Sequence, residues 1–124
     1  MKRIFIFSVL LLFGAACEDD NGGGVTIDCD ARTITYDSDI KAIVDRTCAY
    51  SGCHDGDPFS TAPHNYTVYA GMLIPLENGR FRRRVLEQRS MPDPDSVPNG
   101  APNRLTDEEL AIIDCWLKAG HPEN

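Results

Sequence analysis

Residues 48–54 read Cys48-Ala49-Tyr50-Ser51-Gly52-Cys53-His54, a stretch in which four residues separate two thiols and an imidazole follows at once. Cysteine sulfur and histidine nitrogen are common ligands of metals and metal-containing groups. Gly52 stands directly before the second cysteine, where it can take a positive φ that other residues resist. This stretch is therefore the first candidate for a binding site.

The usual signature of covalent haem attachment is Cys-x-x-Cys-His, in which two thiols join the porphyrin and the histidine ligates the iron. Here the spacing is two residues longer. Because the porphyrin fixes the distance between its vinyl groups, the extra residues must bulge outward, and Gly52 supplies the freedom that this requires. The stretch predicts thioether attachment through Cys48 and Cys53, with His54 as an iron ligand whose second ring nitrogen donates to a backbone carbonyl.

Apolar spacing predicts helices on both sides of this motif. A first helix is expected over about residues 38–47, with Asp37 or Ser38 as its N-cap. Two more are expected over about residues 67–78, despite Pro75, and 81–88. Residues 55–64 and 90–104 are rich in Gly, Asp and Pro and predict loops. The apolar residues on one face of the first helix, together with the motif cysteine, are Ile40, Ile43, Val44 and Cys48.

The last helix has the most definite boundaries. Thr106 and Glu109 stand at capping-box spacing, and the apolar positions 110, 113 and 117 line one face beside Trp116. Gly120 ends the helix, and Pro122 prevents the chain from resuming it.

The order of these features resembles that of a class I cytochrome c over about residues 36–120. The matching parts are the first helix, the attachment motif, Met91-Pro92 in a proline-rich loop, and the terminal helix with its tryptophan. The resemblance implies an all-α fold of three to four short helices around one covalent haem, with long loops. It implies His54 and Met91 as axial ligands and electron transfer without catalysis. Met72 is expected in the core, and His64 and His121 on the surface.

The N-terminal segment predicts export and lipid anchoring. Residues 1–16 combine Lys2 and Arg3 with an apolar run too short to span a bilayer, and Cys17 follows small residues as in a bacterial lipoprotein signal. Residues 17–28 are expected to form an acidic, glycine-rich tether to a domain over residues 29–124. Of the remaining cysteines, Cys29 and Cys115 are expected to form a disulfide, since exported proteins keep such bonds.

Charge limits the expected partners. Twelve Lys and Arg against 19 Asp and Glu give a net charge of -7, which argues against nucleic-acid binding. The expected partners are an unidentified redox protein and the membrane that holds the anchor, at the periplasmic face or the cell surface. Five arginines, which are Arg80, Arg82, Arg83, Arg84 and Arg89, form a basic cluster that indicates docking, pairing with haem propionates or a solvated helix face.

Two alternatives remain open at this point. In the first, the chain is a haem-free interaction domain of a surface lipoprotein, in which Cys48 and Cys53 form a second disulfide and His54 has no special role. In the second, Cys48, Cys53, His54 and Met91 bind copper, for which sulfur and imidazole are suitable ligands.

Overall fold

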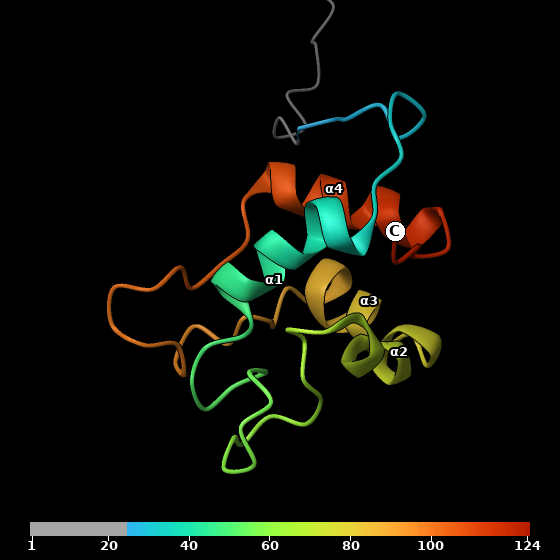
Figure 1. Ribbon diagram of the computed structural model, residues 1–124. Helices are drawn as coiled ribbons and strands as arrows, with labels where there is room; N and C mark the ends of the chain where they lie inside the picture. The colour runs from blue at the N-terminus through green and yellow to red at the C-terminus, as the bar shows by residue number, and fades with distance from the viewer. Residues whose placement is uncertain (1–24) are drawn as a thin grey trace, which may run out of the picture.

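The computed structural model describes residues 25–124, and the regular structure in this range consists of helices without strands (Figure 1). The all-α class is confirmed for these residues. The π-helical segments η1 and η2 continue directly into or from an α-helix. The elements are η1 (Tyr36–Ile40), α1 (Lys41–Thr47), α2 (Tyr69–Glu77), α3 (Arg80–Arg82), η2 (Arg83–Glu87) and α4 (Asp107–Lys118).

The N-terminal predictions fall largely beyond this range. The signal segment, residues 1–16, the lipidation site Cys17 and the tether up to residue 24 lie outside the described residues. Residues 25–28 of the tether are irregular, and Ile27 packs against the core. Between residues 25 and 124 no helix has the length and hydropathy needed to cross a bilayer.

The first helix begins earlier than expected, because its N-cap is Thr35 and not Asp37 or Ser38. The Thr35 hydroxyl accepts a hydrogen bond from the Ser38 N–H at 3.2 Å, and the Asp39 carboxylate accepts one from the Thr35 N–H at 3.2 Å. The chain enters through a π turn, in which Ile40 N–H donates to the Thr35 carbonyl. Because a π turn is wider than an α turn, the N-cap lies earlier in the sequence than α-helical periodicity predicts.

Helix α4 confirms the predicted capping box. Thr106 N–H donates to the Glu109 carboxylate at 2.8 Å, and Glu109 N–H donates to the Thr106 hydroxyl at 3.2 Å. Arg46 of α1 forms an ion pair with the same Glu109 carboxylate, which links the two helices. Cys115 of α4 forms a disulfide with Cys29, with Cα atoms 5.3 Å apart, so the start of the described chain is fastened to its last helix.

A single core lies between these helices, where α1 runs beside α4 and α2 and α3 lie beneath them in Figure 1. Trp116 is fully buried and meets Phe81 edge-on with ring centroids 6.3 Å apart. Met72 is also fully buried, which confirms its expected core position. Helix α2 continues through Pro75, whose burial in the core offsets the backbone hydrogen bond that proline cannot donate.

The long loop between α1 and α2 is held against the helices. The Tyr36 hydroxyl donates to the Tyr66 carbonyl at 2.8 Å, and Tyr66 N–H donates to the His54 carbonyl at 2.9 Å. Gly71 of α2 packs directly on the backbone of Asn65, so that a Cβ at position 71 would overlap the Asn65 carbonyl. The loop's path past Tyr66 therefore depends on a glycine in the neighbouring helix.

We expect Gly71→Ala to destabilise the protein by about 1–3 kcal/mol through this overlap. In a helix without the contact, the same change stabilises by up to about 1 kcal/mol. Ala70→Gly, at an exposed position of the same helix, is the matched control and should cost about 1 kcal/mol. Urea unfolding gives the free energy of unfolding of the wild type and of both variants. A Gly71→Ala variant more stable than the wild type would contradict the close contact.

Candidate haem-binding cavity

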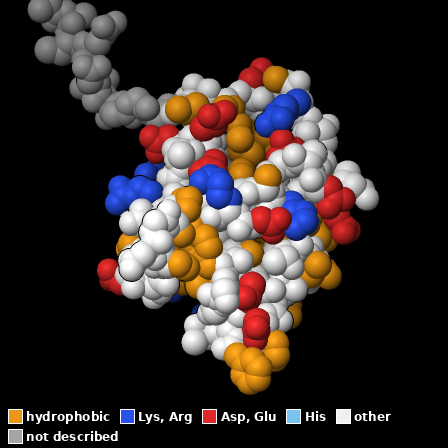
Figure 2. Space-filling model, turned by 60° about the vertical axis from the view of Figure 1, so that its left-hand side comes forward, with side chains coloured by type: hydrophobic (Ala, Val, Ile, Leu, Met, Phe, Trp, Pro, Cys, Tyr) orange, Lys and Arg blue, Asp and Glu red, His pale blue; other side chains and the backbone are white. Residues whose placement is uncertain are grey.

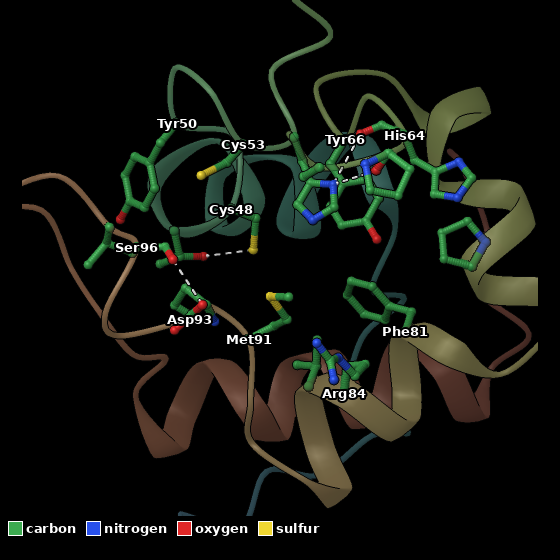
Figure 3. Close-up of a pocket in the computed structure, with 18 of the residues that line it drawn as sticks. Cys48, Tyr50, Cys53, His64, Tyr66, Phe81, Arg84, Met91, Asp93 and Ser96 are labelled. Carbon is green, nitrogen blue, oxygen red and sulfur yellow. Dashed lines mark hydrogen bonds between the residues drawn. The ribbon is translucent and has the colours of Figure 1, made fainter. Parts of the chain in front are cut away.

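A cavity of about 340 Å³ lies between the end of α1, the loop that follows it, the α3–η2 helix and the loop after η2. This volume falls within the roughly 300–1,000 Å³ typical of small-molecule and cofactor sites. Figure 3 shows the Cys48 thiol and the Met91 thioether entering it from opposite walls. Cys48, Cys53, His54 and Met91, the four residues predicted to bind haem, all line this cavity.

The motif forms a closed turn that absorbs its extra residues. Cys53 N–H donates to the Tyr50 carbonyl at 2.8 Å, and His54 N–H donates to the Cys48 carbonyl at 3.2 Å. Gly52 has φ +83°, as a tight turn with a left-handed third residue requires. The positive φ expected of Gly52 is therefore confirmed, and the longer spacing still returns His54 to the end of α1.

Both motif cysteines are thiols. They are not bonded to each other, so the structure does not contain the second disulfide of the interaction-domain alternative. Cys48 is buried at the end of α1, and its sulfur lies 3.4 Å from the Thr47 hydroxyl. Burial raises the pKa of the Cys48 thiol, which keeps the group protonated at neutral pH.

Backbone carbonyls fix the tautomer of His54. Its Nδ1 lies 2.8 Å from the Pro63 carbonyl oxygen and 3.1 Å from that of His64. Because carbonyls only accept, Nδ1 carries the proton, and Nε2 keeps the lone pair that a metal ligand needs. The predicted hydrogen bond from the second ring nitrogen is therefore confirmed. Burial lowers the pKa of His54 below its usual value of 6.5, although the two carbonyls oppose this effect.

Tyr66 lines the cavity beside His54, and sequence reasoning gave it no role. The two rings are stacked, with centroids 3.9 Å apart and planes within 1° of parallel. Tyr66 is buried, and desolvation raises its pKa to about 12. No periodicity or motif surrounds Tyr66, since it lies in the irregular loop before α2, and its role depends on contacts between distant residues.

Met91 lies at the start of the irregular loop between η2 and α4. Its side chain is half-buried, packs against the core and reaches the cavity. The two other histidines, His64 and His121, were expected to be plain surface residues, but each contacts other parts of the protein. His64 lines the cavity, and His121 packs edge-on against Trp116 while its Nδ1 lies 3.2 Å from the Tyr69 hydroxyl. Both histidines have positive φ, 73° at His64 and 51° at His121.

Comparison of this chain with protein-family models, curated proteins and solved structures gives no match. Within residues 25–124, no three His, Cys, Asp or Glu side chains lie close enough together to hold a metal ion. The copper alternative would need Cys48, Cys53 and His54 to form such a group. The cavity lining instead includes the imidazoles of His54 and His64, the thioether of Met91 and two separate thiols.

We expect the ligand-free chain to keep His54 neutral and protonated at Nδ1, which two-bond nitrogen-15 correlation spectra detect. A lowered pKa in the folded state means that the unfolded chain binds the proton more readily. The neutral imidazole of His54 therefore contributes fully to the free energy of unfolding above about pH 6.5, and this contribution is lost as the pH falls below that value.

The matched variant is His54→Asn, which keeps a donor near the two carbonyls but does not titrate. Its stability should change less than that of the wild type between about pH 7.5 and pH 5. Asp55 and Asp114 have lowered pKa values, so their contributions change only in more acidic solution. Equal slopes for the two proteins would contradict a buried, neutral His54.

Proposed function

We propose that the chain is an exported, lipid-anchored c-type cytochrome domain that carries one covalent haem and transfers electrons. Cys48 and Cys53 would hold the haem, and His54 and Met91 would be its axial ligands. The observation that carries the proposal is the orientation of His54. Its Nδ1 is engaged by two carbonyls, and both cysteines and Met91 share its cavity.

The donor set fits a porphyrin iron better than a bare ion. A porphyrin supplies four nitrogen ligands of its own, so the protein needs to provide only the two axial ones, as His54 and Met91 would do. The thiols of Cys48 and Cys53 are unpaired with each other and therefore open to attachment. Phe81 and Val85 add buried apolar wall, which suits the flat faces of a macrocycle.

Haem bound here would supply one-electron redox chemistry. The chain's own residues would orient and enclose it. The Pro63 and His64 carbonyls hold the imidazole ring of His54 in one orientation, and Tyr66 covers its face. The soft thioether of Met91 favours reduced iron. With both axial positions filled by protein, no site would remain for a substrate, so the domain would carry electrons and not catalyse a reaction.

The proposed setting follows from the sequence at the N-terminus. The signal segment and Cys17 support export and lipid anchoring, and the Cys29–Cys115 disulfide suits an oxidising compartment. The partners would be a redox protein and the anchoring membrane, with no nucleic acid. Figure 2 shows acidic and basic side chains mixed over one face, without a continuous basic surface of the kind that tracks phosphates.

We expect the full chain, produced with bacterial haem-attachment machinery, to gain the mass of one haem. Cys48→Ser/Cys53→Ser should lose this covalent mass, and His54→Ala should abolish the folded haem-loaded protein. His121→Ala is the matched control, because His121 lies outside the cavity, and it should stay loaded. A colourless, iron-free product with a mass that reports two disulfides would favour the haem-free interaction domain.

Met91→Leu should leave haem attached but change its spin state and lower its reduction potential, because the iron loses a thioether ligand. Met72→Leu makes the same chemical change in the core, away from the cavity, and should leave the absorption spectrum as it is. Absorption spectra and redox titration measure both variants. An unchanged spectrum for Met91→Leu would assign the second axial position to another residue.

A further inference from the structure

The arginines of the cluster after α2 do not share one environment. Arg82 forms an ion pair with Asp114 of α4 at 3.1 Å, which ties the α3–η2 helix to α4. Arg83 is exposed and does not line the cavity. Arg80 and Arg84 both line it. The cluster is therefore not a uniform solvated face, and two of its members need a separate explanation.

Arg80 and Arg84 are four residues apart and so lie on one side of the helix. Phe81 and Val85 have the same spacing and line the cavity beside them. Within residues 25–124, neither guanidinium forms a salt bridge or a side-chain hydrogen bond (Figure 3 shows Arg84). The charge of Arg80 also lowers the pKa of the Tyr66 hydroxyl in the cavity wall, against the larger effect of desolvation.

The acidic residue that shares the cavity already has partners. The Asp93 carboxylate accepts hydrogen bonds from the Ser96 hydroxyl at 2.9 Å and from the Asp95 N–H at 3.1 Å. These contacts hold Asp93 within its own loop. The charges of Arg80 and Arg84 are therefore available to an anionic ligand.

We propose that Arg80 and Arg84 form a carboxylate-binding edge of the cavity, which selects a planar ligand with two carboxylate groups on one side. Guanidinium and carboxylate groups match in geometry and form paired hydrogen bonds. The inference rests on the proposed function, in which the two carboxylates are the haem propionates. The ligand would then have one orientation in the cavity, with the thiols at the α1 end and the two guanidinium groups along the α3–η2 helix.

The test uses the full chain from a host without haem-attachment machinery and two probes, iron protoporphyrin IX and its dimethyl ester. The free acid should bind at least about tenfold more tightly than the ester, because only the acid pairs with the guanidinium groups. Arg80→Gln/Arg84→Gln should remove this preference. Arg83→Gln, on the same helix but outside the cavity, should keep it.

Equal affinity for acid and ester, or a preference that survives in Arg80→Gln/Arg84→Gln, would overturn the inference. Failure of both probes to bind would also overturn it. A second measurement uses the chain loaded with haem by attachment machinery. There the double variant should have a lower reduction potential than Arg83→Gln, since two cations near the iron have been removed. Equal reduction potentials for the haem-loaded double variant and haem-loaded Arg83→Gln would contradict the role of Arg80 and Arg84 but not the binding of haem.

Discussion

Backbone hydrogen bonds on every side of His54 are the constraint on which the cavity depends. Its N–H donates to Cys48, its carbonyl accepts from Tyr66, and its Nδ1 meets the carbonyls of Pro63 and His64. These contacts join the end of α1 to the far side of the following loop. The ring cannot rotate or change tautomer without losing its hydrogen bonds to these carbonyls, so the position of Nε2 is set by the backbone.

The cavity wall continues into the core, which explains how so small a chain can hold the site. Tyr66 stacks on His54 and meets Phe81 at 6.0 Å, and Phe81 in turn meets Trp116 of α4. The disulfide through Cys115 fastens the same helix to the start of the described chain. A domain of this length buries a limited apolar core. Tyr66 and Phe81 therefore belong both to the core and to the cavity wall.

Features decided by neighbouring residues could be predicted from the sequence, and those decided by distant contacts could not. The capping box at Thr106 and the positive φ of Gly52 follow from local rules, and both are confirmed. The cap at Thr35 depends on a wider π turn that periodicity does not report. Tyr66 and the division of the arginines depend on which helix face packs inward, and a run of arginines contains no such information.

The environment of the proposed haem also bears on its redox state. Apolar walls such as Phe81 and Val85 disfavour extra charge, and the reduced iron in a porphyrin carries less net positive charge than the oxidised form. A thioether from Met91 acts in the same direction. Asp93 in the opposite loop acts against both, but it is exposed, so solvent and salt screen its charge. If haem is bound as proposed, this balance would favour reduced iron, and the domain would accept electrons readily and pass them to a stronger oxidant.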